Sequence, residues 1–347
     1  MSQPSGLVEV DGSHGEGGGQ LLRTAVALSA ITQRPLHVRS IRAGREKPGL
    51  QAQHLKSVEA VAALCDARLE GARMGSTELM FEPGKIIPRQ LKVDVGTAGA
   101  VTLVLQALTL AAASHDGTTT VELAGGTHVS WSPPVDYFRE IFCRHLRRIG
   151  VEVELTTLRH GFYPKGGGRV DARIKGNSKW AGLDLARCGE VGEVAVRSVA
   201  TEDLRRGRVA ERQADGFKSI LNQASPVEVS YVASFSTGSA VFGSAACGST
   251  VLGADALGKR GIRAEQVGQD AAGQLKAEIN AGASLDVHAA DMMLPYLALA
   301  SGASALTVSE LTGHVTSVQW LIRQFIDVDF STERSGSAYL ISVKPKR

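Results

Sequence analysis

One order of secondary structure recurs along this chain, and the recurrence limits the possible folds more than any other feature of the sequence. Apolar residues alternate in segments such as 36–41, which predicts strands, and recur every three or four residues in segments such as 50–65, which predicts helices. The N-terminal segment gives strand, helix, strand, helix, strand and strand at residues 7–11, 20–31, 36–41, 50–65, 68–72 and 78–82. The next segment repeats this order at residues 91–95, 98–113, 119–124, 134–149, 152–157 and 168–174. A last segment gives helix, strand, helix, strand and strand at residues 287–300, 305–311, 315–325, 328–332 and 338–343. This pattern predicts one structural unit present in three copies.

The recurrence breaks between residues 182 and 282. This span has a different pattern, with strands predicted at 191–199, 227–234 and 239–246 and helices at 209–223 and 264–279. We therefore predict an α/β (α+β) protein in which three βαβαββ-type repeats form a large domain from residues 1–181 and 283–347. A smaller α/β domain is inserted at residues 182–282. A length of 347 residues agrees with about two domains.

Composition, charge and the lengths of the apolar runs argue against a secreted protein and a membrane protein. The hydrophobic share of 43% and the charged share of 21% are ordinary for a soluble globular chain, and the net charge of +3 leaves no dominant basic tail. The four cysteines are far apart and form no CxxC motif, which favours reduced thiols in the cytoplasm. The N-terminus has no signal-peptide pattern, and the longest apolar run, near residues 102–113, is too short to cross a bilayer. These features predict a soluble, cytoplasmic protein.

A glycine-rich turn, EVDGSHGEGGGQLLRTA at residues 9–25, joins the first predicted strand to the first predicted helix. Glycine lets backbone amides come close to a ligand, and the positive end of the following helix points at the turn. Glu16 lies among the glycines and Arg23 lies about one turn into the helix. This arrangement suits a phosphate and a metal ion, although a tight turn without a ligand explains the spacing equally well. It is neither a P-loop nor a dinucleotide fingerprint.

His314 follows a predicted strand and lies in the first turn of a predicted helix, which Thr312 or Gly313 could cap. The positive helix end favours neutral imidazole and therefore lowers the pKa of the ring. Neutral imidazole is the nucleophilic form, so His314 could attack phosphorus and form a phosphoramidate. The alternative is a histidine that caps the helix or packs against its neighbours.

Two further segments could hold an anionic ligand. The loop SIRAGREKPGLQAQHL at residues 40–55 places Arg42, Arg45 and Lys47 together, and paired guanidinium groups match a phosphate oxyanion. RHGFYPKGGG at residues 159–168 joins two predicted strands. Proline and glycine are typical of a hairpin turn, but three glycines beside a lysine and a histidine exceed what a hairpin needs. The alternatives are a solvated loop and an ordinary hairpin.

The glycine-rich turn, the basic loop, the RHGFYPKGGG segment and His314 resemble the corresponding parts of the RNA 3'-terminal phosphate cyclases. The same resemblance extends to TLVLQ at 102–106, GGT at 125–127, SPP at 132–134 and ADMMLP at 290–295. The resemblance runs from residue 11 to about 326. It implies the repeat-and-insertion fold predicted above and an RNA-processing ligase that forms a phosphoric ester. In this chemistry a histidine takes AMP from ATP, AMP passes to an RNA 3'-phosphate, and the 2'-hydroxyl then displaces AMP to close a 2',3'-cyclic phosphate. RNA is the implied substrate because only RNA carries that hydroxyl.

The resemblance also implies a role for individual residues. His314 matches the nucleophile that becomes adenylylated, and Glu16 matches a carboxylate that contacts Mg²⁺ or another divalent metal. The implied ATP-binding residues are Gln106, Pro133, which packs on the adenine, and the segment His288, Ala289, Ala290, Asp291 and Met292. The implied pocket for phosphate and the RNA end consists of Arg23, Arg42, Arg45, Gln53 and His54. The implied partner is RNA with a 3'-phosphate end, with no membrane and no obligatory protein partner.

The sequence departs from the family pattern at a few positions. Some members have Tyr in place of His288 and Gln in place of Met292, and an acid is common where this chain has His128. Two other classes remain as alternatives. A non-catalytic branch of the family serves in ribosome assembly, but it lacks the active-site histidine. Enolpyruvyl-transfer enzymes are built from similar repeats, but they need a different set of basic residues and lack the RHGFYPKGGG hairpin.

Overall fold

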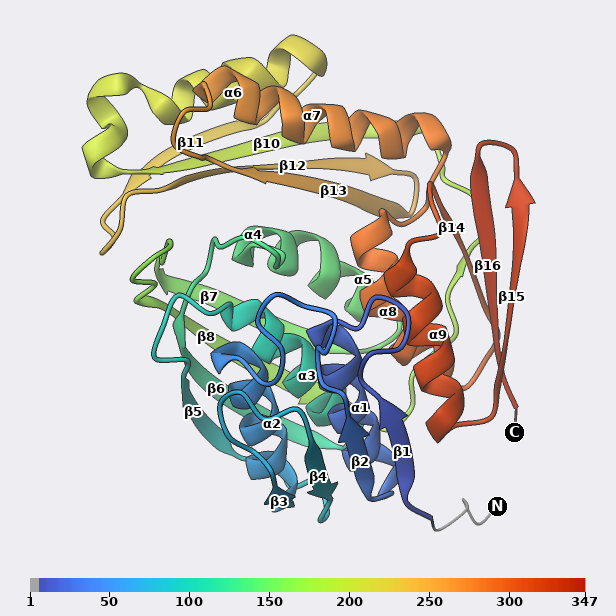
Figure 1. Cartoon of the computed structure of the whole chain (residues 1–347). Helices are drawn as coiled ribbons and strands as arrows, with labels where there is room; N and C mark the ends of the chain where they lie inside the picture. The colour runs from blue at the N-terminus through green and yellow to red at the C-terminus, as the bar shows by residue number, and fades with distance from the viewer. Residues whose placement is uncertain (1–5, 347) are drawn as a thin grey trace.

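A computed structural model of the chain describes residues 6–346 (Figure 1). Within these residues the strands form four sheets of four strands each. The predicted α/β class is confirmed, and so are the three repeats with an inserted α/β unit.

The three repeats share one sheet topology. In each sheet the first strand pairs parallel with the second, and the fourth strand lies antiparallel between the second and the third. The first sheet has β1 (Val8–Asp11), β2 (Leu36–Arg39), β3 (Arg68–Glu70) and β4 (Leu79–Glu82). The second has β5 (Gln90–Asp94), β6 (Gly117–Gly125), β7 (Glu152–Arg159) and β8 (Gly168–Gly176). The third has β9 (Asp184–Leu185), β14 (Ser304–Val308), β15 (Val328–Ser335) and β16 (Ala338–Pro345).

Strand β9 completes the third repeat and was not predicted, since it has only two residues. It pairs with β14 through Ala305↔Asp184 and Leu306↔Leu185. The third repeat therefore begins before the inserted segment, inside the span 182–282 that the sequence assigned to the insertion. The segment enters this repeat between its first strand and its first helix.

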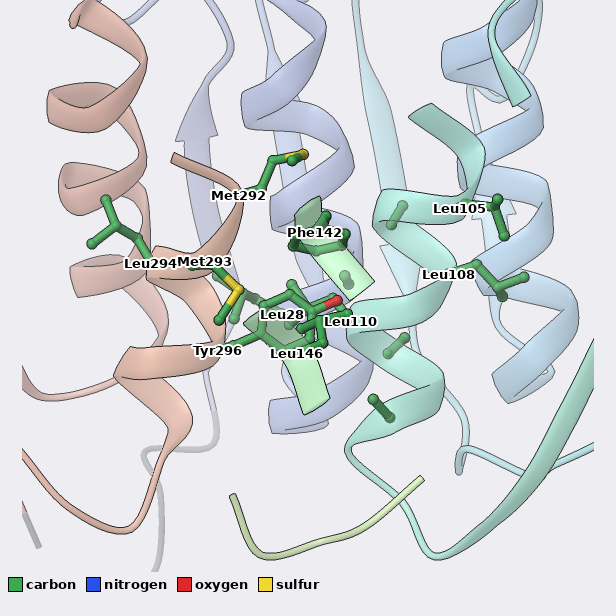
Figure 2. Packing of buried hydrophobic residues seen from close by; sticks show 14 of the residues in the cluster. Leu28, Leu105, Leu108, Leu110, Phe142, Leu146, Met292, Met293, Leu294 and Tyr296 are labelled. Atoms are coloured by element: carbon green, nitrogen blue, oxygen red, sulfur yellow. The ribbon is translucent and has the colours of Figure 1, made fainter. Parts of the chain in front are cut away.

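Each repeat contributes helices to a shared core. They are α1 (Gly19–Thr32) and α2 (Ala52–Cys65) from the first repeat, α3 (Val101–Ala113), α4 (Val135–Tyr137) and α5 (Cys143–Arg148) from the second, and α8 (Val287–Leu299) and α9 (Gly313–Phe325) from the third. A π-helical turn, Phe138–Phe142, joins α4 to α5, so the helix predicted at 134–149 is continuous but contains an irregular middle turn. Leu28 of α1, Leu110 of α3, Leu146 of α5 and Tyr296 of α8 pack together at the centre (Figure 2). Burial of such apolar side chains is the main stabilising term of the fold.

The inserted segment forms its own sheet with two helices. The strands β10 (Val191–Thr201), β11 (Val227–Val232), β12 (Ser239–Cys247) and β13 (Thr250–Leu257) have the order β11-β10-β12-β13. Helices α6 (Val209–Ile220) and α7 (Ala264–Ala281) cover its outer face (Figure 1), and a short 3-10 helix, Glu202–Gly207, precedes α6. Phe217, Val241 and Leu275 belong to a separate apolar cluster between these helices and the sheet.

Strand β13 was missed from the sequence because its centre is a glycine, which weakens a strand pattern. The structure explains that glycine. A Cβ at Gly253 would lie 2.5 Å from Cγ1 of Ile141, so the helical segment of the second repeat packs directly on this strand. In the part of the chain that the structure describes, no helix has the length and apolarity needed to cross a membrane.

Buried His145 should make the stability of this fold depend on pH. Its Nε2 donates to the carbonyl of Val251 at 3.0 Å, and burial lowers its pKa to about 4. The unfolded chain therefore binds a proton below about pH 6.5 that the folded chain excludes. We expect the free energy of unfolding to fall by up to about 3 kcal/mol, for this group alone, as the pH falls from 6.5 to 4. Urea unfolding across this range measures the slope. His145→Gln should make it shallower and exposed His115→Gln should not, whereas equal slopes in all three proteins would contradict the assignment.

Candidate active site

The glycine-rich turn between β1 and α1 folds onto helix α9 of the third repeat. Asp11 accepts from the backbone and hydroxyl of Ser13 at 2.9 and 2.7 Å, which closes the first part of the turn. The ring of His14 stacks on Trp320 of α9 with centroids 3.8 Å apart. Gly15 has a φ of +57°, and a Cβ there would lie 2.1 Å from Oγ of Ser317, so this position needs glycine. These contacts hold the first repeat's turn against the third repeat's helix.

This docking brings Glu16 to His314. Nε2 of His314 lies 3.0 Å from Oε2 of Glu16, although about 300 residues separate them in sequence. His314 is the second residue of α9, and Thr312 caps the helix by accepting from the Val315 amide at 3.2 Å. Gly313 leaves room for the carboxylate, because a Cβ there would lie 2.6 Å from Oε1 of Glu16. Of the two caps that the sequence allowed, the structure uses Thr312.

The electrostatic surroundings of His314 favour the neutral ring. Its pKa is lowered, first by burial and then by the nearby charges of Arg23 and Arg45 and by His288, while Glu16 acts in the opposite direction. The direction agrees with the sequence argument, but burial is the largest cause. The side chain is still 39% exposed, so a ligand can reach it. A neutral, accessible imidazole can act as a nucleophile.

The basic loop at residues 40–49 lies beside the same turn. Nη2 of Arg45 donates to the Glu16 carbonyl at 3.1 Å and lies 4.0 Å from Oε2 of its carboxylate. Arg42, with a φ of +54°, donates through Nη1 to the carbonyls of Lys47 and Gly49 at 2.6 and 3.0 Å. Arg42 therefore shapes the loop, whereas Arg45 faces the carboxylate beside His314.

Arg23 and His54 are buried next to each other. A Cβ at Gly19 would lie 2.1 Å from Nε2 of His54 and 2.9 Å from Nη1 of Arg23, so the backbone of the turn passes directly over both side chains. Burial lowers the pKa of Arg23 to about 10, and burial followed by the charges of Arg23 and Arg42 lowers the pKa of His54 to about 3. Nδ1 of His54 accepts from the Gln51 amide at 3.3 Å, which closes the N-terminus of α2. Arg23 is thus charged and His54 neutral at pH 7.

Helices α3 and α8 form the other side of the candidate site. Nη2 of Arg23 donates to Oε1 of Gln106 at 3.4 Å, and Nε2 of Gln106 contacts Sδ of Met292. Burial, followed by the charge of Asp286, raises the pKa of Asp291 well above its usual range, and Arg23 acts against this. These side chains surround a small pocket of about 30 Å³. Its lining includes polar Gln20, Arg23, Gln106 and Asp291, together with Met292 and Tyr296.

The remaining predicted residues lie either at the start of α8 or beside α3. His288 is exposed at the start of α8, where its ring lies 6.4 Å from that of Tyr137, whereas the side chains of Ala289 and Ala290 are fully buried. Those alanines can present only backbone to a ligand. Gln53 accepts from the Ala100 amide at 3.0 Å, and Pro133 accepts from the Thr102 hydroxyl at 2.7 Å. Gln53 and Pro133 thus border α3, one on its N-terminus and the other one turn before Gln106.

Some residues of this region were missed from the sequence. Ser317 accepts from the Glu16 amide at 3.4 Å and donates to the Gly313 carbonyl at 2.6 Å, so it fixes the turn near His314. Its spacing of four residues from Gly313 places it on the same helix face, which is a signal that the sequence offered. His128, where an acid is common, forms a buried pair with Asp136, Nε2 to Oδ2 at 3.0 Å. This departure is therefore accommodated by a partner on the next helix.

Comparisons with known proteins identify the family of this chain. A family model described as RNA 3'-terminal phosphate cyclase matches residues 14–332. A protein of that name from Archaeoglobus fulgidus is 43% identical over 92% of this chain and 96% of its own length. Proteins of the same name from Methanopyrus kandleri and Pyrobaculum neutrophilum are 40% and 41% identical, over 98% and 97% of this chain and 99% and 98% of their own lengths. A solved enolpyruvyl transferase from Streptomyces tendae covers 98% of this chain and 48% of its own at 12% identity, and its TM-score of 0.39 supports no inference. The resemblance drawn from the sequence is thus confirmed, and this chain belongs to the RNA 3'-terminal phosphate cyclase family.

Proposed function

We propose that this chain converts the 3'-phosphate of an RNA into a 2',3'-cyclic phosphate at the expense of ATP. Membership of the cyclase family supports the reaction. The observation that carries the proposal for this chain is the 3.0 Å contact between His314 and Glu16, which joins the histidine of the third repeat to the glycine-rich turn of the first. Non-catalytic members lack that histidine, so its presence in a half-exposed, polar site favours the enzyme.

In the first step we assign Nε2 of His314 as the nucleophile, because this nitrogen faces Glu16 and the loop with Arg45. The Nε2 lone pair attacks the α-phosphorus of ATP, an N–P bond forms, and the P–O bond to pyrophosphate breaks. The lowered pKa of His314 keeps this lone pair available at neutral pH. Arg23 lies close enough to lower the pKa of this ring, so it also stabilises negative charge that builds up on the ATP phosphates.

In the second step an oxygen of the RNA 3'-phosphate attacks the phosphorus of the histidine-bound AMP, and the N–P bond breaks. In the third step the neighbouring 2'-hydroxyl attacks the terminal phosphorus of the RNA and expels AMP. Arg42 and Arg45 are the cations proposed to hold the RNA phosphate. Gln106, Pro133 and the start of α8, with Asp291 and Met292, are proposed to hold the adenosine.

The residues present also fit a divalent metal bound together with substrate. Mg²⁺ typically uses one or two protein carboxylates and takes its other ligands from phosphates and water. Glu16 is a half-exposed carboxylate beside the nucleophile, and its backbone is fixed by Ser317 and Arg45. When bound, the metal would offset negative charge on the ATP phosphates.

The reaction can be followed directly at the RNA end. RNA with a labelled 3'-phosphate should become resistant to phosphatase when incubated with this protein, ATP and Mg²⁺. DNA with a 3'-phosphate should stay sensitive, because it lacks the 2'-hydroxyl. Protection that needs no ATP, or that also occurs with DNA, would contradict the proposed chemistry.

Arg45→Ala should separate RNA binding from the first step. Its side chain is 45% exposed, so the substitution should leave the fold intact. Loss of a charged hydrogen-bond donor to phosphate should raise KM for 3'-phosphorylated RNA roughly 10- to 100-fold, with a much smaller effect on transfer of AMP to the protein. Arg39→Ala, at a 57% exposed arginine of β2, is the matched control. Equal KM values for the two variants would remove Arg45 from the RNA site.

We also propose that the protein has two domains and acts in the cytoplasm. A separate apolar cluster within the inserted segment supports the smaller domain. The pairing of β9 with β14 favours a boundary after Leu185, a few residues later than the sequence suggested. All four cysteines are free, which is typical of a reducing compartment.

A further inference from the structure

Three loops converge beyond the candidate active site, at the edge where the second repeat meets the inserted segment. They are residues 128–133, the hairpin turn 160–167 between β7 and β8, and residues 233–238 between β11 and β12. The His128 amide donates to the Gly161 carbonyl at 3.1 Å, and the Lys165 amide donates to Oγ of Ser236 at 3.0 Å. Figure 1 shows the hairpin turn and the β11–β12 connection side by side at the left edge of the molecule. The motif RHGFYPKGGG thus forms a junction between two parts of the chain.

Each loop exposes one aromatic side chain. Trp131 is 96% exposed, Tyr163 is 75% exposed and Phe235 is 57% exposed, and within residues 6–346 no other Trp, Tyr or Phe is exposed. We call these three residues the aromatic rim. Because all the others are at least partly buried, the clustering of three exposed rings on adjoining loops is not explained by the need to cover a core.

Trp131 gains almost nothing from folding. Its side chain is open to solvent and its φ is +66°, a left-handed conformation that costs a residue with a Cβ roughly 1 kcal/mol. A large ring held out in an unfavourable backbone conformation is better explained by a ligand than by stability.

Cations lie among the rings. The guanidinium of Arg159 lies 4.3 Å from the centroid of Phe235, and its Nε donates to the Gly167 carbonyl at 2.5 Å. Lys165 is exposed at the tip of the hairpin. Exposed rings interleaved with cations are the pattern by which proteins bind single-stranded nucleic acid, because bases stack on the rings and phosphates meet the charges.

The loops of the rim and several residues of the candidate active site contact the same segment of the chain, the start of α3. A Cβ at Gly166 would lie 2.7 Å from the Thr97 carbonyl, so the hairpin rests on the segment leading into α3. Gln53, the neighbour of His54, contacts that same segment at Ala100. On the other side Trp131 is two residues from Pro133, which contacts α3 one turn before Gln106. The rim and the residues proposed to hold the RNA end and the adenosine therefore border the same N-terminal end of α3.

We propose that the aromatic rim binds the nucleotides that precede the 3'-phosphate of the RNA, by stacking of their bases on Trp131, Tyr163 and Phe235. The inference rests on the proposed function, since it assumes an RNA end at His314. Stacking of this kind accepts any base. The rim would therefore make longer RNAs bind more tightly without selecting a particular sequence.

The test is a comparison of two lengths of 3'-phosphorylated, fluorescently labelled RNA, of about 3 and about 12 nucleotides, because only the longer strand can span a binding site of this kind. Anisotropy gives Kd for each with the full-length protein. Trp131→Ala, Tyr163→Ala and Phe235→Ala should each weaken binding of the long RNA about five-fold or more, and leave the short RNA within about two-fold. Tyr163→Phe should bind as the unmodified protein does. Phe330→Ala, at an aromatic ring of β15 in the third sheet, is the control.

Unchanged Kd values for the long RNA in all three variants would overturn the proposal. So would variants that change the sedimentation of the protein alone while RNA binding stays the same, which would identify the rim as a contact between protein chains. Labelling of the protein by ATP is measured separately and should be the same in every variant. The unmodified protein could neither take up AMP nor cyclise RNA while the rim variants still bind the long RNA more weakly. That result would contradict the proposed function but support the aromatic rim as an RNA-binding surface.

Discussion

His314→Ala should abolish covalent transfer of AMP to the protein. With ATP labelled at the α-phosphate and Mg²⁺, the unmodified protein should acquire a label that is labile to acid and stable to alkali, as expected of a phosphoramidate. Alanine removes the only atom that the mechanism uses to form the N–P bond, so the rate should fall by three orders of magnitude or more, in the range typical of a lost catalytic nucleophile. Cyclisation of RNA should fall with it.

The fold should survive this substitution. The side chain of His314 is 39% exposed, and the helix is capped by Thr312 rather than by the imidazole. Thermal unfolding should therefore change little, by about 1 kcal/mol at most, as for other partly exposed positions. Exposed His115→Ala provides the matched control for labelling. Labelling of His314→Ala at the normal rate would place the nucleophile elsewhere, and no labelling of the unmodified protein would favour an RNA-binding role.

The largest effect on stability is expected from Asp286→Ala. This carboxylate is 1% exposed and accepts four hydrogen bonds. Oδ1 accepts from the amides of His288 and Ala289 at 3.2 and 3.0 Å and from the hydroxyl of Tyr137, and Oδ2 accepts from the Gly253 amide at 3.0 Å. Burial and the charge of Asp286 raise the pKa of Tyr137 well above its usual value, so the phenol remains a donor. One side chain thus ties α8 of the third repeat to α4 of the second and to β13 of the insertion.

Removal of Asp286 should leave these donors buried without partners. We expect the free energy of unfolding to fall by about 4 kcal/mol, since each buried unsatisfied polar group costs about 1–3 kcal/mol and part of the loss is relieved by relaxation. Urea unfolding measures the change. Asp329→Ala, which breaks only an exposed ion pair with Lys346, should cost less than about 1 kcal/mol. A loss of similar size in both variants would show that the four contacts contribute little.

Most of the secondary structure could be predicted from local pattern. The helix expected at 20–31 is α1, Gly19–Thr32, and the strand expected at 338–343 lies within β16, Ala338–Pro345. Both have strong apolar periodicity, which depends only on neighbouring residues. The strands that were missed lack that signal. β9 has two residues, and β13 contains Gly253, whose role appears only when Ile141 packs on it.

The candidate site was predictable in its residues but not in its contacts. Glu16 and Arg23 stand out in a glycine-rich turn, and His314 stands out in the first turn of a helix. Spacing places Ser317 on the same helix face as Gly313, but nothing local indicates that Trp320 would receive that turn or that Asp286 would join three elements. Gln53 and His54 were assigned to an RNA pocket, and the structure adds hydrogen bonds that hold the starts of α3 and α2.

By itself the sequence determined three related units, an insertion, the family, and the side chains with suitable chemistry, because periodicity and motifs are properties of neighbouring residues. Only the tertiary structure decided which of those side chains meet. Packing of α1 against α9 and α3 brings Glu16 to His314 across about 300 residues and buries Arg23 beside Gln106. Burial, which lowers the pKa of His314, exists only in that packed state, since an extended chain leaves the imidazole in water. The histidine was therefore readable from the sequence, but its neutrality and its carboxylate partner come from the fold.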